Sequence, residues 1–176
     1  FIIVHNNVHS LICFEERIER FLTELEDRPW DLLVFSETWR AETNEAFITH
    51  HGHAWFGSGG TQGQRGVGFL LHSRWQHSFF KPLSERCAAI GIRVTPKFRL
   101  RVIATYMPHS GQPDEDVDMM YAMLQAEHAE AKAKGDYTVI AGDLNAEVGP
   151  RDIFDSHDVM GENPMPHRSD RGALLL

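Results

Sequence analysis

The sequence predicts a layered α/β domain. Short apolar runs alternate with amphipathic helical patterns along the whole chain, and this alternation is typical of α/β folds. No internal repeat or low-complexity linker divides the chain, and its 176 residues suit one domain rather than two. A composition of 42% hydrophobic and 24% charged residues is ordinary for a globular protein. We therefore expect a single domain over residues 1–176.

The N-terminal half predicts three strands and one helix. Residues 1–4 form an apolar run that we interpret as a strand entered directly, so we expect the N-terminus to lie close to the domain boundary. Apolar residues then recur at helical spacing over 11–25, and Pro29 disfavours helix at the residue before it. Residues 32–35 and 67–72 are short apolar runs of the kind that buried strands show.

The C-terminal half predicts three more strands and a longer helix. Residues 88–94 and 100–106 have strand character, and the polar stretch between them could turn a hairpin. A helix is expected over 116–134, where Gly135 would end it as a C-cap glycine. Residues 138–141 then form a strand that leads into a polar loop.

Net charge and cysteine content narrow the possible functions. The formal net charge of −8 argues against tight, sequence-independent binding of nucleic acid, which requires an excess of Lys and Arg. It leaves phosphodiester chemistry open, because a Mg²⁺ site requires carboxylates and the ion brings positive charge to a phosphate. Cys13 and Cys87 form no disulfide or zinc pattern, so we expect free thiols. No apolar run approaches the roughly 20 residues of a membrane span, and no membrane partner is expected.

Polar side chains that could carry chemistry follow the predicted strands. In chain order these residues are Asn7, Glu37, Tyr106, His109, Asp143 and Asn145. Strand ends held by a rigid sheet commonly present catalytic groups. We therefore expect these residues to converge at one end of the sheets, with Glu37 and Asp143 close enough to share a metal ion or a bridging water.

Each residue type has a chemical use and a plainer alternative. The Asp143 carboxylate could orient or deprotonate a water, and the Asn145 amide could stabilise charge on a phosphoryl oxygen, but an ordinary turn explains both equally well. Taken singly, Glu37 more often marks a surface turn and Asn7 an Asx-turn. Tyr106 would more often be a core residue with its hydroxyl at the rim.

The motifs taken together carry more information than each alone. They are Asn7-Val8, Ser36-Glu37-Thr38-Trp39, the Gly-Val-Gly-Phe strand that begins at Gly66, Tyr106-Met107-Pro108 and Gly142-Asp143-Leu144-Asn145-Ala146. In type, order and spacing the series resembles the endonuclease/exonuclease/phosphatase superfamily. Within it, the series looks most like the apurinic-endonuclease-like domain of non-LTR (LINE-type) retrotransposons. The resemblance implies a four-layer α/β sandwich, with two mixed sheets packed face to face and helices outside.

The resemblance also implies roles for the residues that match. Glu37 would be the principal ligand of Mg²⁺, or of Mn²⁺, with Asn7 beside it. Tyr106 would contact the scissile phosphate, Asp143 would orient or activate the attacking water, and Asn145 would stabilise the charge that develops on phosphorus. Three further residues are weaker candidates for substrate contact: Arg65, Arg86 and His109.

One departure concerns the end of the motif series, which in the family is Ser-Asp-His on a late strand. This chain has Ser169-Asp170-Arg171, and residues 172–176 resemble a segment that precedes the final motif in the family. We therefore expect the domain to be incomplete at its C-terminus, without its last strands and their His. On this interpretation residues 1–176 alone would be weakly folded and close to inactive.

The predicted function is Mg²⁺-dependent hydrolysis of phosphodiesters, by in-line attack of water, in an endonuclease that nicks DNA. The alternatives are a phosphatase or phosphodiesterase of the same fold acting on small phosphoesters, and a non-catalytic remnant. We expect a monomer, or part of a larger polyprotein with a reverse transcriptase, and no obligate protein partner. No signal fixes the compartment, although an intracellular or nuclear site would suit the function.

The histidine cluster His50, His51 and His53 is a second candidate for metal binding. Imidazoles bind transition metals, but no carboxylate stands beside them in the sequence. A solvated loop is therefore the favoured interpretation of this cluster.

Overall fold

The computed structural model describes residues 1–61, 64–150 and 167–173. Its elements in chain order are β1 (Ile3–Asn7), α1 (Phe14–Glu24), β2 (Leu32–Ser36), β3 (Glu45–Ile48), β4 (Ala54–Ser58), β5 (Val67–Leu71), β6 (His77–Ser84), β7 (Cys87–Arg93), β8 (Arg99–Tyr106), α2 (Asp114–Lys134), β9 (Tyr137–Asp143) and α3 (Asp170–Ala173). No helix in these ranges has the length and apolar character needed to cross a membrane.

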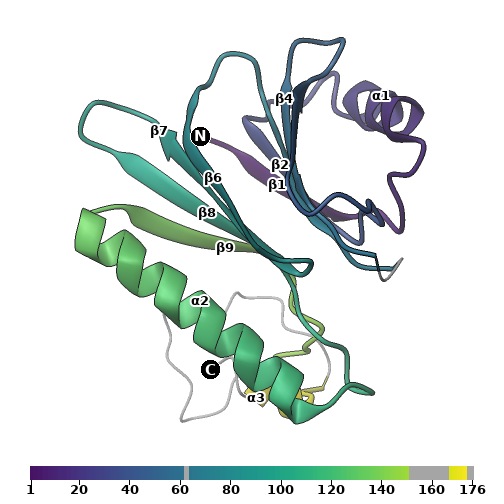
Figure 1. Ribbon diagram of the computed structural model, residues 1–176, viewed down its shortest axis with the longest axis vertical. Helices are drawn as coiled ribbons and strands as arrows, with labels where there is room; N and C mark the ends of the chain where they lie inside the picture. Colours follow the sequence, from purple (N-terminus) through teal and green to yellow (C-terminus); the bar gives the residue numbers. More distant parts are fainter. Residues whose placement is uncertain (62–63, 151–166, 174–176) are drawn as a thin grey trace.

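The strands form two mixed sheets. The five-stranded sheet has the order β1-β2-β5-β4-β3, and the four-stranded sheet has the order β6-β7-β8-β9. Two pairs are parallel, β1 with β2 and β8 with β9, and the remaining pairs are antiparallel. The sheets face each other, with α1 outside the first and α2 outside the second (Figure 1). The predicted four-layer α/β sandwich is confirmed.

The central strands β2, β5, β7 and β8 are buried on both faces, which explains their continuous apolar runs. In β2, Leu32 and Val34 face the second sheet, while Leu33 and Phe35 face α1. The layer between the sheets is closed by the alternate residues of β5, β7 and β8. A third cluster joins the outer face of β7 and β8 to α2 through Cys87, Ala89, Ile103, Met107, Val117, Met120 and Leu124.

The two predicted helices are present with shifted starts. α1 begins at Phe14 rather than Leu11, because residues 11–13 form a loop in which Leu11 is fully buried. α2 begins at Asp114 rather than Asp116, after Pro113 at the N-cap and with an acidic first turn that suits the helix dipole. It ends before Gly135, whose φ of +70° is the left-handed conformation expected of a C-cap glycine.

Strands β3, β4 and β6 were not predicted from the sequence. β3 alternates between half-buried and exposed positions at the edge of its sheet, and β6 is an edge strand that contains Lys81 and Pro82. β4 is buried but short, and Gly57 interrupts its apolar pattern. Edge strands carry a weaker hydrophobic signal because one side and part of a face stay in solvent.

Candidate active site

The carboxyl ends of two parallel strand pairs meet at one end of the sandwich. Asn7 is opposite Ser36 in the first sheet, and Tyr106 is opposite Asp143 in the second. The Asn7 side-chain amide donates to Glu37 Oε1 at 2.7 Å and to Asp143 Oδ2 at 3.1 Å. One amide therefore links a carboxylate from each sheet, and the expected convergence of Glu37 with Asp143 is present.

Glu37 is held as an anion by its neighbours. Its side chain is 13% exposed, and it accepts hydrogen bonds from Asn7, from the Tyr106 hydroxyl and from His9. Burial alone would raise the pKa of Glu37, but these hydrogen bonds and the His9 charge outweigh it and hold the pKa below its ordinary value. A charged carboxylate at neutral pH is what a hard cation requires.

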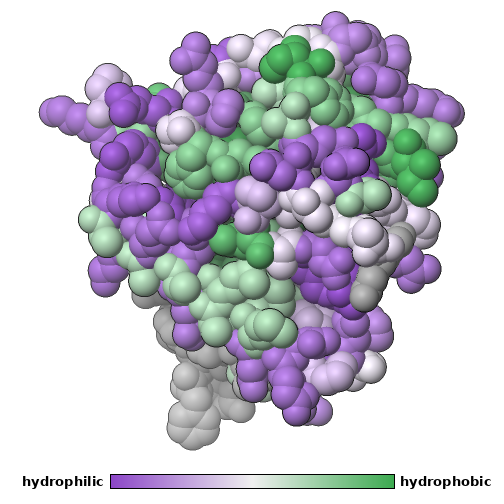
Figure 2. Space-filling model, in the orientation of Figure 1, coloured by the Kyte–Doolittle hydropathy of each residue, from purple (hydrophilic) through white to green (hydrophobic). Residues whose placement is uncertain are grey.

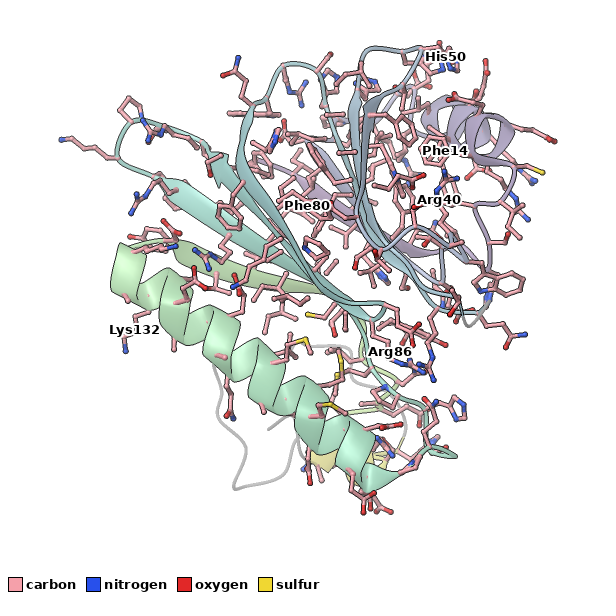
Figure 3. The ribbon with its side chains drawn as sticks, viewed as in Figure 1. Phe14, Arg40, His50, Phe80, Arg86 and Lys132 are labelled. Atoms are coloured by element: carbon pink, nitrogen blue, oxygen red, sulfur yellow. The ribbon has the colours of Figure 1, made fainter. Side chains whose placement is uncertain are left out.

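Tyr106 remains a hydrogen-bond donor. Burial is the largest cause that raises the pKa of its phenol, and the negative charge of Glu37 adds to it, while Arg86 acts in the opposite direction. The Arg86 guanidinium lies over the Tyr106 ring at 4.8 Å and donates to Gln112 at 2.8 Å. Figure 3 shows Arg86 at the end of the sheets where the site lies. Because the phenol keeps its proton, it can donate to an anionic oxygen.

Asp143 and Asn145 form both a turn and a site. The Asn145 backbone N–H donates to Asp143 Oδ1 at 2.9 Å, and its side-chain amide donates to the Met107 carbonyl at 2.6 Å. A Cβ at Gly142 would collide with the Thr105 carbonyl, so only glycine allows β9 to approach β8 this closely before the loop. The turn thus fixes Asp143 while its other oxygen reaches Asn7.

Several site residues have backbone conformations that non-glycine residues rarely adopt. The φ angles of Glu37 and Asn145 are +56° and +46°, and Trp39 and His9 are also positive. Such residues persist only where the surroundings hold them, and they concentrate at functional sites. Residue type and spacing carry no signal for this feature.

The weaker candidates for substrate contact share one pocket with the site. Arg65, Arg86 and His109 line it together with Glu37 and Tyr106. Arg65 is paired with Glu85, and Arg86 is 9% exposed. Burial is the main reason that the pKa of Arg86 is lowered, with the Arg65 charge next. The two guanidiniums therefore give the pocket a positively charged side next to Glu37.

The segment Ser169-Asp170-Arg171 lies on the α2 side of the loop that follows β9. The Ser169 hydroxyl bonds the backbone of Glu147, and Arg171 donates to the Gln112 carbonyl at 3.1 Å and to Asp114 at 3.3 Å. Together with Asn145, this segment lines a pocket beside α2, separate from the one that Glu37 lines. Residues 174–176, the end of the segment that resembles the family pattern, lie outside the described residues.

Two histidines at the site were missed by the sequence analysis. His9 Nδ1 is 3.1 Å from Glu37 Oε2, and the ring is 73% exposed. His5 Nε2 is 3.1 Å from the hydroxyl of Ser36, the residue before Glu37. Burial lowers the pKa of His5, although the negative charge of Asp143 acts to raise it. Position alone could have suggested His9, because it is two residues past Asn7 in the same strand-end loop.

The donor atoms of the site fit a hard divalent cation. Glu37 and Asp143 supply carboxylate oxygens in a half-buried site that opens to a polar pocket, and the Asn7 amide lies between them, with its nitrogen toward both carboxylates and its oxygen accepting from the His9 N–H at 3.3 Å. Oxygen ligands of this kind suit Mg²⁺ or Mn²⁺. When bound, the ion would be held by Glu37 and Asn7.

The protein is thus a two-sheet α/β sandwich that carries a solvent-open cluster of carboxylates and amides at its strand ends. The model of the Endonuclease/Exonuclease/phosphatase family matches residues 7–172. The chain therefore belongs to this family, as its motifs predicted.

Solved structures share the fold at low sequence identity. The 3′ phosphatase NExo from Neisseria, bound to a product DNA hairpin, matches with a TM-score of 0.60 and 19% identity over 84% of this chain and 58% of its own. An AP endonuclease from Archaeoglobus fulgidus gives a TM-score of 0.58 and 18% identity over 85% of this chain and 60% of its own. The endonuclease domain of TRAS1, a telomere-specific non-LTR retrotransposon, gives a TM-score of 0.52 and 14% identity over 82% of this chain and 59% of its own.

The chain thus spans about three fifths of the length of each of these structures. No curated protein matches the sequence closely enough to count as a relative.

Proposed function

We propose that this protein hydrolyses phosphodiester bonds with a bound Mg²⁺ or Mn²⁺ ion, and that it nicks DNA in the manner of a retrotransposon endonuclease. The observation that carries the proposal is the Asn7 amide, which joins Glu37 and Asp143 from opposite sheets. This contact gathers one anionic ligand, one general base and one neutral amide within a single solvent-open site.

The residues divide the chemistry among them. Glu37 and Asn7 hold the cation, which supplies positive charge to the phosphate when bound. Asp143 orients the attacking water and accepts its proton. The side-chain amide of Asn145 and the protonated phenol of Tyr106 donate hydrogen bonds to phosphoryl oxygens, where negative charge develops.

The two arginines that line the pocket support the proposal of a polyanionic substrate. Arg65 and Arg86 line the same pocket as Glu37 and Tyr106, where their positive charges could contact the phosphates of a substrate. The formal net charge of −8 means that binding depends on these few contacts and weakens as salt is added. The DNA-bound 3′ phosphatase and the AP endonuclease share the fold, which adds support for DNA.

Nicking of supercoiled plasmid DNA tests the proposal. We expect Mg²⁺-dependent nicking that EDTA abolishes and that Asp143→Ala reduces by about 10²–10⁴-fold, the usual contribution of a positioned acid or base. Glu37→Ala should lower the rate and raise the Mg²⁺ concentration required. The assay is run on residues 1–176 and on the same chain with any sequence that its gene encodes beyond Leu176.

The matched control is Asp27→Ala, an exposed acidic residue in the loop after α1. It should nick at the parental rate. If Asp143→Ala or Glu37→Ala nicks as fast as the parent in an active form of the chain, the proposed mechanism is wrong.

A further inference from the structure

We infer that the β3–β4 turn and α1 form a second metal site, which takes a divalent transition-metal ion of the zinc type. Glu19, His50 and His51 each offer a ligand atom, and these atoms all lie within 4.8 Å of one another. Within the ranges that the structure describes, this is the one group of three or more such side chains. The carboxylate that the sequence did not place beside the histidines comes from the helix.

Backbone hydrogen bonds fix the turn from which the two imidazoles project. The Thr49 N–H donates to the His53 carbonyl at 2.8 Å, and the Gly52 N–H donates to the Thr49 carbonyl at 2.9 Å. Gly52 has a φ of +80°, which a side chain would strain, and Thr49 is 4% exposed. His50 and His51 occupy the tip of this closed turn, with ring centroids 3.9 Å apart.

α1 presents two carboxylates to the same imidazole. Glu15 and Glu19 are one turn apart on one face of the helix. His50 Nδ1 is 2.7 Å from Glu15 Oε2, and His50 Nε2 is 3.7 Å from Glu19 Oε2. Figure 3 shows His50 at the tip of the turn, above α1. His50 Nε2 thus faces a carboxylate oxygen with which it could share a cation, while the hydrogen bond between Nδ1 and Glu15 orients the ring.

A buried aromatic contact sets the distance between helix and turn. Phe14, at the start of α1, is 7% exposed and packs edge-on against Trp55 of β4 at 4.6 Å and Phe47 of β3 at 5.1 Å. The first turns of α1 and the β3–β4 hairpin therefore dock as one unit. The ligand atoms are brought together by the core, although the side chains themselves are half exposed or more.

The ligand chemistry selects the ion. Two imidazoles and one carboxylate, with water completing the shell, form a set that Zn²⁺ and its neighbours accept, whereas Mg²⁺ prefers oxygen alone. His53 is not part of the set, because its Nδ1 accepts from the Ser73 N–H at 3.1 Å and its ring packs against Trp30.

The second site is remote from the first. Ser36, the neighbour of Glu37, pairs with Val67 of β5. Val67 in turn pairs with Ser58, the last residue of β4, so Glu37 lies near the C-terminal end of β4. The histidine turn precedes Ala54, at the start of β4. The two sites therefore occupy opposite ends of the five-stranded sheet. Zinc at the turn would tie the hairpin to α1 and stabilise the folded chain by mass action.

Calorimetric titration with Zn²⁺ in saturating Mg²⁺ tests the inference on residues 1–176. We expect one Zn²⁺ equivalent and a melting temperature that rises with Zn²⁺ but not with further Mg²⁺. His51→Ala and Glu19→Gln should each weaken this binding at least tenfold. Glu16→Gln, on the same helix, and His77→Ala, at another exposed histidine, are matched controls that should bind as the parent does.

The Glu37→Ala variant distinguishes the inferred zinc site from the candidate active site. We expect it to keep the Zn²⁺ equivalent even if it abolishes nicking, so that either idea can fail alone. Absence of a Zn²⁺ equivalent in the parent would overturn the inference. So would loss of that equivalent in Glu37→Ala, or its unchanged affinity in His51→Ala.

Discussion

At the scale of single residues, Asp31 shows how one buried carboxylate organises the edge opposite the active site. It is 5% exposed and precedes β2. It accepts hydrogen bonds from the Ile2 backbone, from Arg74 Nε at 2.8 Å and from the Trp75 indole. These donors come from the start of β1 and from the segment between β5 and β6, so a single side chain joins three parts of the first sheet.

The pKa of Asp31 gives a prediction for acid stability. Burial would raise this pKa, but the bonds from Trp75, Ile2 and Arg74 outweigh it and lower it. A carboxylate with a lowered pKa stabilises the fold above its unfolded pKa of about 3.9, and that stability is lost as the pH falls through the folded value. We expect Asp31→Asn to cost about 2–4 kcal/mol at pH 7 and to flatten the loss of stability below about pH 4.

Urea unfolding at a series of pH values measures this effect. Asp27→Asn, at an exposed position, should follow the parental curve. An Asp31→Asn variant that is as stable as the parent at pH 7 would show that the network is held by packing rather than by the charge.

The sequence located the reactive residues better than it described their environment. Glu37 lies just after β2 and Asp143 at the end of β9, and each of these strands pairs in parallel with a neighbour that ends in Asn7 or Tyr106. The position of these residues at strand ends was predictable, whereas the docking of the two sheets that brings Glu37 to Asp143 came from the resemblance to the family. Their proposed roles stay predictions. The left-handed backbone at Glu37 and the contact with His9 could not be predicted, because both arise from tertiary packing across 28 residues of sequence.

At the scale of elements, α2 is attached to the second sheet by charge as well as by apolar contact. Arg101 of β8 and Glu127 of α2 are 1% and 2% exposed and pair at 2.5 Å, and Lys81 of β6 bonds Glu127 at 2.6 Å. The Arg101 guanidinium also lies over the Phe79 ring at 4.7 Å. The buried face of α2 therefore contains one acid, which blurs its amphipathic pattern in the sequence.

Removing one member of this pair should be far worse than removing both. We expect Glu127→Ala to destabilise the chain by about 3–5 kcal/mol, because it leaves a buried cation without its main partner. The double variant Arg101→Met with Glu127→Leu should recover most of that loss, since apolar residues of similar size suit the site. Denaturant unfolding at neutral pH compares the three proteins.

Glu130→Ala is the control, because Glu130 is 38% exposed on the same helix and its loss should destabilise the chain far less than Glu127→Ala does. If the double variant is less stable than Glu127→Ala, the attraction within the ion pair contributes more to the free energy of unfolding than the cost of its desolvation.

The same contrast explains which elements the sequence predicted. α2 was predicted because Gly135 ends it and an acidic turn begins it, and β2, β5, β7 and β8 because they are buried on both faces. β3 and β6 escaped because edge positions mix polar with apolar residues. Edge strands are specified mainly by their neighbours, which a pattern along the chain does not record.

At the scale of the whole molecule, β9 is one of the two edge strands of the second sheet in the described part of the chain. Tyr137, Val139 and Ile140 are 62%, 36% and 46% exposed along it. Figure 2 shows apolar patches among hydrophilic ones on the face in view. A sheet edge with exposed apolar side chains is a template for association with another strand.

We expect residues 1–176 to self-associate at raised concentration through β9, and Ile140→Lys to suppress this association. A lysine on an edge strand opposes pairing by charge and by its hydration. Light scattering and size-exclusion chromatography measure the effect. Ile12→Lys, which makes the same change at a 69% exposed loop position, should associate as the parent does. Equal suppression by both variants would attribute the effect to net charge instead.

The single amide of Asn7 has a consequence for how this protein tolerates damage. Because Glu37 belongs to one sheet and Asp143 to the other, the site is assembled only while the two sheets stay docked. A slight opening of the sandwich would part them long before either sheet lost its own hydrogen bonds. We therefore expect phosphodiester hydrolysis to be lost first: in a heated or mutated molecule, the proposed activity would stop while the secondary structure of the chain was still intact.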